Sequence, residues 1–331
     1  MEGYLVLRVL LGLVSSALLV CSSVVLSEGT ARLHLQEGGT GFAIAAYAPT
    51  GSAVESALSQ AESSGRRDPQ AAVMLSILAD RYRAQHRYAA AEELYGRSLA
   101  MLQETMGTQH PNVGTAAHKL GQMLRSQGAY AKAEPYYRSA LAVFERALGP
   151  DHANVTELLG EMAALYQAQN RYDELERVYL RLLGITERTL GVDHPVAISL
   201  LNDLAGLYQV RGRYDDAEAL AKRALRRVER TKGHQHPSVA AILNELAGIY
   251  QLQGRLADAE LQYRRSIAIL ERAFGTDHPA LEVALNGIAV LYQTQGRMSE
   301  AEAASRRSTA VANARYRGQW IGPLVVQQRS R

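Results

Sequence analysis

Residues 194–225 read HPVAISLLNDLAGLYQVRGRYDDAEALAKRAL, and residues 236–267 read HPSVAAILNELAGIYQLQGRLADAELQYRRSI. The two stretches align without a gap at a spacing of 42 residues, and the same unit is written six times between residues 68 and 317. Asp68 opens the first copy, and the other five open with His110, His152, His194, His236 and His278. A period of this length indicates a solenoid, in which each unit buries its apolar face against its neighbours.

Each copy predicts two helices. In the fourth copy Leu201, Leu204, Ala205 and Tyr208 share one helical face at i, i+3, i+4 and i+7. Proline suits the first helical position, because its missing N–H would be unpaired there. The first helices are therefore expected to start at Pro69, Pro111, Ala153, Pro195, Pro237 and Pro279. They should end near a Gly-Arg element such as Gly212-Arg213, and the second helices at Gly107, Gly149, Gly191, Gly233 and Gly275.

One position of the second helix carries a small residue where the two helices of a hairpin must approach. Its occupants are Ala91, Ala133, Ala217, Ala259 and Ala301, with Leu175 in the third copy. A leucine would crowd a close contact between helices. The hairpin of the third repeat is therefore expected to be wider than the others.

These residues resemble the tetratricopeptide repeat family. Its first helix carries Leu, a small residue and then Tyr, matched by Leu204, Ala205 and Tyr208, and its second helix carries small residues matched by Ala217 and Ala224. The 42-residue spacing and the phrases LGVDHP, LNDLAGLY and RGRYDDAE are similar to the kinesin light chain type of this repeat. The resemblance covers residues 68–317 and implies an all-α fold, a right-handed α-solenoid of helix-turn-helix repeats. The coiled-coil heptads that precede the repeats in kinesin light chains are missing here.

The ends of the chain lie outside the period. Residues 1–27 include an uncharged stretch from Val9 to Leu26 and are interpreted as a signal peptide or a membrane anchor. Residues 28–51 predict a flexible linker, and residues 52–64 a helix that caps the solenoid, which spans 52–317. Residues 318–331 form a C-terminal tail that either covers the last repeat or binds a partner. We therefore expect the chain to be exported, to the periplasm or outside the cell, or to be membrane-anchored by its N-terminal segment.

A polar stripe follows the first helices away from their apolar face. Its members in the later repeats are Ser199, Asn202, Asn244 and Asn286, with Gln167, Gln209, Gln251 and Gln293 nearby. The small Gly206 and Gly248 would leave room beside it. In proteins that the repeats resemble, the first helices line a concave groove, and the Asn at this position holds the backbone of an extended peptide. Amides suit that task because each has a donor and an acceptor, although a solvated helix face would also be polar.

Other site classes have weak support in the sequence. Histidines on successive stacked helices are about 8–10 Å apart, too far to share a zinc ion, so we expect no metal and no cofactor. The net charge is only +3, and the pairs Arg226-Arg227, Arg264-Arg265 and Arg306-Arg307 stand among glutamates, which argues against nucleic acid as a partner. No nucleotide-binding or nucleophile motif is present, so the chain is not expected to be an enzyme.

The sequence therefore predicts a non-catalytic scaffold for protein–protein interaction. Its partner would be a protein or peptide, held as an extended segment in the groove, and membrane contact would be made only through the N-terminal segment. Two alternatives remain open at this point. One is a structural solenoid that self-associates, and the other is an accessory or regulatory subunit of an enzyme complex.

Overall fold

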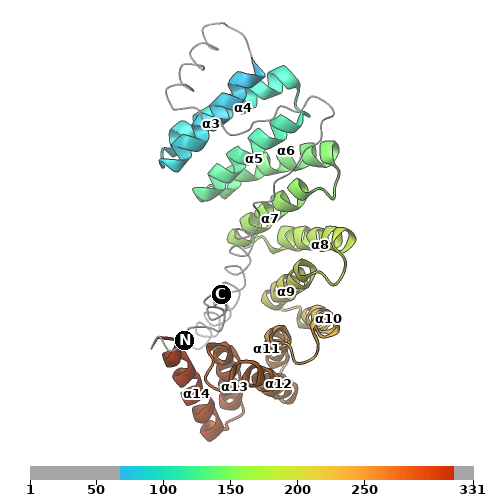
Figure 1. Cartoon of the computed structure of the whole chain (residues 1–331), viewed down its shortest axis with the longest axis vertical. Helices are drawn as coiled ribbons and strands as arrows, with labels where there is room; N and C mark the ends of the chain where they lie inside the picture. The colour runs from blue at the N-terminus through green and yellow to red at the C-terminus, as the bar shows by residue number, and fades with distance from the viewer. Residues whose placement is uncertain (1–67, 317–331) are drawn as a thin grey trace, which may run out of the picture. The chain divides into compact units, whose positions relative to one another are not determined.

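The computed structural model describes residues 68–316, and every regular element in this part of the chain is a helix (Figure 1). The α-helices are α3 (Pro69–Ala84), α4 (Tyr88–Met106), α5 (Pro111–Ser126), α6 (Tyr130–Leu148), α7 (Ala153–Ala168), α8 (Tyr172–Thr189), α9 (Pro195–Val210), α10 (Tyr214–Lys232), α11 (Pro237–Leu252), α12 (Leu256–Phe274), α13 (Glu282–Thr294) and α14 (Met298–Tyr316). Odd-numbered helices are the first helices of the repeats, and even-numbered helices are the second. Each first helix packs against the second helix of its own repeat and against that of the preceding repeat. The predicted all-α solenoid of helical hairpins is confirmed.

The six predicted repeats therefore fall within the described residues, except for their last position. The signal or anchor segment 1–27, the linker 28–51, the capping helix 52–64 and the tail 318–331 lie outside them. Between residues 68 and 316, no helix is both long enough and apolar enough to cross a membrane.

The first residue of each repeat caps the first helix. The Nδ1 atom of His194 accepts a hydrogen bond from the backbone N–H of Val196 at 3.3 Å. The same bond forms at His110, His152, His236 and His278, with lengths of 3.0–3.2 Å. In the first repeat Asp68 replaces the imidazole, and its Oδ1 accepts from the N–H of Gln70 at 2.9 Å. The histidines thus satisfy N–H groups that a helix start leaves unpaired.

Most helix boundaries agree with the sequence prediction. The first helices begin at Pro69, Pro111, Ala153, Pro195 and Pro237. The prediction for Pro279 was wrong in detail, because this proline opens a short 3₁₀ turn (Pro279–Leu281) and α13 begins only at Glu282. A 3₁₀ turn is a common way for a helix to start, since its tighter hydrogen bonds serve the first unpaired groups.

The turn inside each hairpin requires a left-handed residue. Gly212 fills this position with φ 72°, as predicted, and allows the chain to enter α10 two residues later. In the third repeat the same position holds Asn170 with φ 56°. Its side-chain oxygen accepts a hydrogen bond from the Tyr172 hydroxyl at 3.0 Å, which helps to hold this less favourable conformation.

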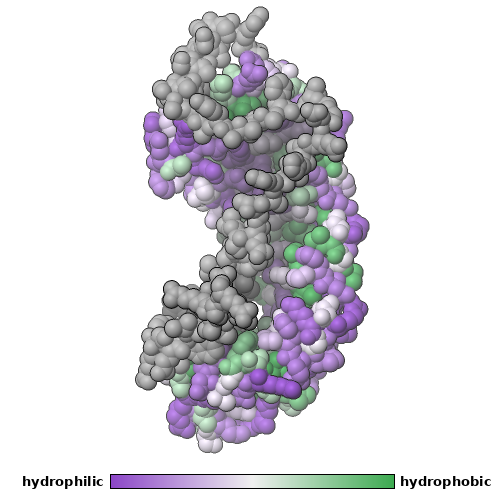
Figure 2. Space-filling view, in the orientation of Figure 1, coloured by the Kyte–Doolittle hydropathy of each residue, from purple (hydrophilic) through white to green (hydrophobic). Residues whose placement is uncertain are grey.

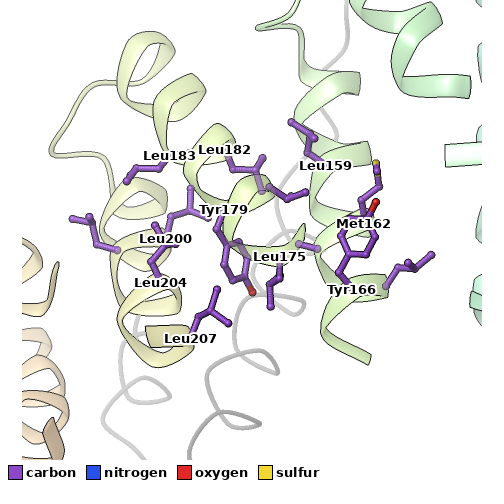
Figure 3. Close-up of a cluster of buried hydrophobic side chains, with 14 of the residues drawn as sticks. Leu159, Met162, Tyr166, Leu175, Tyr179, Leu182, Leu183, Leu200, Leu204 and Leu207 are labelled. Atoms are coloured by element: carbon purple, nitrogen blue, oxygen red, sulfur yellow. The ribbon is translucent and has the colours of Figure 1, made fainter. Parts of the chain in front are cut away.

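The interior is a continuous apolar layer between first and second helices. Figure 3 shows part of it, with Leu175 and Tyr179 of α8 pointing between Met162 and Tyr166 of α7 on one side and Leu204 of α9 on the other. All five of these side chains are less than 9% exposed. The backbones of α7 and α8 approach each other at fewer positions than those of the other hairpins. This agrees with the wider third hairpin that Leu175 predicted.

A clamp of three side chains joins each repeat, from the second onward, to the next. At the junction of the third and fourth repeats, Glu176 accepts hydrogen bonds from the Tyr208 hydroxyl at 2.8 Å and from Arg213 at 2.9 Å. The guanidinium of Arg213 also lies 4.0 Å from the centre of the Tyr208 ring. The equivalent trios are Glu134/Tyr166/Arg171, Glu218/Tyr250/Arg255 and Glu260/Tyr292/Arg297. The clamp fixes the spacing of the first helices, and with it the spacing of the polar stripe.

Second helices are joined by a further set of ion pairs. Arg265 pairs with Glu229 at 2.5 Å, and Arg223 pairs with Glu187 at 2.8 Å, each across one repeat. Arg307 and Glu271 form the same pair in the last junction. Figure 2 shows purple, hydrophilic residues over most of the visible surface of α8, α10 and α12, broken by small green patches. Of the arginine pairs on α10 and α12, Arg226 and Arg264 are exposed, Arg265 is partly buried and Arg227 is buried.

Candidate binding site on the first helices

The predicted polar stripe lies on consecutive first helices. Gln167 stands on α7, whereas Ser199, Asn202 and Gln209 stand on α9. Asn244 and Gln251 follow on α11, and Asn286 and Gln293 on α13. The residues on α7, α9 and α11 are partly buried, but Asn286 and Gln293 are exposed. The structure therefore separates a recessed part of the stripe from an exposed end.

Two asparagines in the recessed part have unsatisfied acceptors. The Oδ1 atoms of Asn202 and Asn244 are buried, and neither has a hydrogen-bond partner. Asparagines 42 residues apart are thus in the same state on neighbouring helices. A buried acceptor without a partner costs about 1–3 kcal/mol, so a donor brought by another molecule would recover that energy.

The glutamines of the stripe are not equivalent. Gln251 already accepts a hydrogen bond at its Oε1 from the Tyr263 hydroxyl of α12, at 2.7 Å. One acceptor site of its Oε1 atom is therefore used inside the repeat, and its NH₂ group and the second lone pair are left for a ligand. Beside the stripe, a Cβ atom added at Gly206 or Gly248 would meet no atom within 4 Å. This agrees with the expectation that these glycines leave room.

Two acidic residues that the sequence analysis did not select lie next to these asparagines. Asp203 follows Asn202 on α9, and Glu245 follows Asn244 on α11. Both side chains are partly buried, and neither has a hydrogen bond or an ion pair to any residue between 68 and 316. The signal was present in the sequence, because acidic residues 42 apart occupy this position in three copies, as Glu161, Asp203 and Glu245.

The electrostatics of this pair are unusual for carboxyl groups. Burial raises the pKa of Asp203 to about 6. Burial also raises the pKa of Glu245 to about 8, and the negative charge of Asp203 adds to the effect. The nearby hydroxyl of Tyr179 on α8 has a raised pKa as well, from its burial and from the charge of Asp203. No described cation compensates either carboxyl group, so Glu245 keeps its proton up to about pH 8, and both groups are negatively charged only above that pH.

On α7 the acidic residue at the same repeat position has hydrogen-bond donors. Glu161 accepts hydrogen bonds from His118 at 3.1 Å and from Gln122 at 2.6 Å, both on α5. Burial alone would raise the pKa of Glu161, but the bonds from His118, Gln122 and Tyr137 outweigh it, so its pKa lies below the usual value. Nearby, Asp80 of α3 accepts from Lys119 at 2.7 Å. In the N-terminal part of the face, the carboxylates of Glu161 and Asp80 are therefore paired with side chains of the same face.

The unpaired polar groups of the face include the buried carbonyl oxygens of Asn202 and Asn244. Among residues 68–316, no three His, Cys, Asp or Glu side chains are grouped so that they could hold a metal ion. The arginine pairs of the second helices are engaged, since Arg227, Arg264, Arg265, Arg306 and Arg307 each pair with a glutamate. The free groups of the first helices are acceptors, and they suit donors of a partner.

Comparison with known proteins supports the fold. The sequence matches the tetratricopeptide repeat model in five overlapping segments, 70–146, 112–174, 154–226, 196–272 and 238–314. Because these segments span most of the chain, the protein belongs to the tetratricopeptide repeat family. Repeats of this family generally mediate protein–protein interaction or scaffolding and are typically non-catalytic. No curated protein matches the sequence.

Solved structures with similar folds include kinesin light chain-like repeats. BtubC (BKLC) from P. vanneervenii is 22% identical with a TM-score of 0.52, over 74% of this chain and 96% of that one. A kinesin light chain-type protein of Podosopora anserina with nearly identical TPR-like repeats is 24% identical with a TM-score of 0.52, over 63% and 99%. The apo form of RapI is 15% identical with a TM-score of 0.51, over 82% of each chain. At these identities the likeness concerns the fold, and it confirms the predicted right-handed α-solenoid.

Proposed function

We propose that this chain is a non-catalytic scaffold that binds another protein as an extended segment along α9, α11 and α13. The observation that carries the proposal is the pair of buried, unpartnered carbonyl oxygens on Asn202 and Asn244. Backbone N–H groups of an extended segment are the donors that such oxygens lack. Asn286, Gln209, Gln293 and the free amide of Gln251 would supply further contacts along the same line.

The spacing of the repeats supports this mode of binding. Packed helices are about 8–10 Å apart, and an extended chain advances about 3.3 Å per residue. A bound segment would therefore meet successive asparagines about every three residues, and about seven residues would reach from the first asparagine to the third. The open space beside Gly206 and Gly248 leaves room for the main chain of that segment.

The test is selection from a displayed library of twelve-residue peptides against the purified full chain. Selected peptides are synthesised, and their affinities are measured for the wild type and for the triple variant Asn202→Ala/Asn244→Ala/Asn286→Ala. We expect the triple variant to bind at least about tenfold more weakly, since one lost hydrogen bond to a buried group costs about 1–3 kcal/mol.

The matched control is Arg226→Ala/Glu302→Ala/Arg306→Ala, which removes three exposed polar side chains from second helices. It should bind as the wild type does. Unchanged affinity in the asparagine variant, or a failure to select any peptide, would overturn the proposal. Light scattering of the free protein is measured in parallel, because a stable oligomer would favour the self-associating alternative.

We also propose, from the sequence, that residues 1–27 export the chain or anchor it to a membrane. The support is the uncharged stretch from Val9 to Leu26. Cell fractionation with N-terminal sequencing of the mature protein tests this. A soluble cytoplasmic protein that retains Met1 would contradict it.

A further inference from the structure

The acceptor-rich part of α9 and α11 indicates which chemical class of side chain the bound segment carries. The argument rests on the proposed function, since it concerns an additional contact of the same partner. Four side chains on two neighbouring helices are involved, Asn202 and Asp203 on α9 and Asn244 and Glu245 on α11. The Oδ1 atoms of both asparagines lack hydrogen-bond partners. Within the described part of the chain Asp203 and Glu245 have no hydrogen bond or ion pair, and burial makes their negative charges costly.

The satisfied site on α7 shows what these carboxylates lack. Glu161 receives its donors from two positions of the preceding first helix, occupied by His118 and Gln122 on α5. One repeat later, the residues at the same offsets from Asp203 are Gly160 and Ala164 on α7, and neither has a side-chain donor.

A further repeat on, the residues at the same offsets from Glu245 are Asn202 and Gly206 on α9. Asn202 makes no hydrogen bond to Glu245, and Gly206 has no side chain. A Cβ atom at Gly160 or Gly206 would meet nothing within 4 Å. The donor side chains that hold Glu161 are therefore missing beside Asp203 and Glu245, and the space at Gly160 and Gly206 is open.

A donor from outside can enter this space and must be cationic to be bound well. The site offers two carboxylates and two amide oxygens, and no described lysine or arginine reaches them. A guanidinium has five N–H donors and an ammonium has three, and both bind carboxylates with charge-assisted hydrogen bonds. A neutral or acidic side chain would leave the carboxylates unpaired or add repulsion.

We propose that Asp203 and Glu245, which lie beside Asn202 and Asn244, bind a lysine or arginine side chain of the extended partner segment. The asparagines hold its main chain, and the two carboxylates select its cationic side chain. Binding would also neutralise the repulsion between the two carboxylates. The two carboxylates therefore make binding depend on the partner's sequence, whereas the asparagines contact only its main chain.

The experiment uses three pools of fluorescein-labelled decapeptides, capped at both ends. Nine positions are mixtures of Ala, Ser, Thr, Val and Leu, and the sixth position is fixed as Arg, Gln or Glu. Fluorescence polarisation is measured with the full chain at physiological salt and pH 8.5, above the pKa of both carboxyls. For the wild type we expect the Arg pool to bind about tenfold tighter than the Gln pool, because one charge-assisted pair contributes on the order of a tenfold change. The Glu pool should bind most weakly.

Asp203→Asn/Glu245→Gln should bind the Arg and Gln pools equally, and its affinity for the Gln pool should match that of the wild type. The control Asp277→Asn/Glu302→Gln removes the same charge from exposed positions outside the first helices and should keep the Arg preference. Thermal melts verify that both variants are folded. Addition of Ca²⁺ without peptide tests the other cation that oxygen ligands favour, and stabilisation by Ca²⁺ that needs both carboxylates would overturn the side-chain assignment.

The outcomes separate the two proposals. Equal binding of Arg and Gln pools to the wild type, with loss of binding in the asparagine triple variant, overturns the cation site alone. Binding of no pool overturns both. An Arg preference that survives Asp203→Asn/Glu245→Gln overturns the assignment to these carboxylates.

Discussion

Glu161 on α7 and the pair Asp203 and Glu245 on α9 and α11 occupy one position of the repeat, yet their surroundings are opposite. Glu161 is held by His118 and Gln122, and its pKa lies below the usual value. Asp203 and Glu245 have no such donors, and their pKa values rise to about 6 and about 8. The difference lies in the helix before, where side chains give way to Gly160, Ala164 and Gly206. One repeat position can therefore have hydrogen-bond donors in one region and lack them in another.

The largest change in stability is expected when Glu161 loses its hydrogen-bond donors and so becomes like Asp203 and Glu245. His118→Ala/Gln122→Ala removes both donors on α5 from Glu161 and leaves a partly buried carboxylate unpaired. At pH 8 this should lower the free energy of unfolding by about 2–4 kcal/mol, measured by urea denaturation. Part of the loss is the packing of His118 near Tyr137 and Phe144.

Adding Glu161→Gln to that variant separates the two contributions. The neutral amide removes the unpaired charge, so the triple variant should recover at least about 1 kcal/mol of the loss. No recovery would mean that packing alone stabilises this region, and the electrostatic contrast with α9 and α11 would then fail.

The unsatisfied region should make stability depend on pH in a defined direction. The folded state keeps the proton of Glu245 up to about pH 8, whereas the unfolded chain releases it near the usual glutamate value. This contribution is fully present below the unfolded pKa and is lost as pH rises through the folded pKa. Asp203 acts in the same direction up to about pH 6.

The measurement is the difference in unfolding free energy between the wild type and Asp203→Asn/Glu245→Gln, from pH 5 to pH 9. The variant should gain about 1–3 kcal/mol over the wild type across this range. The difference is required because the pKa of His278 is lowered by burial and contributes in the opposite direction. A constant difference would show that the carboxyls ionise in the folded state as freely as in the unfolded chain.

Introducing the two α5 donors at the corresponding positions of α7 should make the surroundings of Asp203 similar to those of Glu161. Gly160→His/Ala164→Gln places an imidazole and an amide at the same offsets from Asp203 as the α5 donors have from Glu161. We expect the pKa of Asp203 to fall below 6, measured by NMR titration of its carboxyl carbon, with a gain of about 1 kcal/mol at pH 8. Gly160→Ala is the control, since replacing a helical glycine alone is worth about 1 kcal/mol. A carboxyl pKa unchanged from the wild type would mean that α7 does not face Asp203 as α5 faces Glu161.

Loss of an N-cap histidine should cost the same stability in both regions. His152→Ala and His236→Ala each remove one N-cap acceptor and should cost about 1 kcal/mol. His152→Asp and His236→Asp should retain most of that stability, because Asp68 caps the first repeat in the same way. Thermal denaturation measures the four variants. A cost confined to one region would show that the contrast extends beyond the binding face.

The repeat and its helices could be predicted from the sequence because they depend on local patterns. Proline at a helix start and glycine at a turn act through their own backbone, so the period places them within one or two residues. The 3₁₀ turn at Pro279 was not predicted, because the choice between two ways of starting a helix depends on small differences in packing. The role of the histidines was seen only in part. Their spacing marks the boundary, but the bond from Nδ1 to the backbone depends on side-chain rotation.

The binding face was harder to predict because its state depends on residues a full repeat away. Asn202 and Asn244 were selected from the stripe, but nothing local to them shows that their oxygens lack partners. Gln251 is occupied by Tyr263, which stands on the next helix. Asp203 and Glu245 resemble surface acids in sequence, and they become unusual only because Gly160, Ala164 and Gly206 leave them without donors.

The clamp between repeats makes the length of this array adjustable. Glu176 meets Tyr208 and Arg213 through contacts that recur at the same offsets, as Glu218 meets Tyr250 and Arg255. If residues 194–235 were lost as one unit, Glu176 would meet the same two side-chain types at the new junction. Whole units of 42 residues can thus be gained or lost without a new interface. Insertion of one residue would displace all three members of a clamp, so such an array varies in whole copies, and each copy adds or removes one segment of the binding face.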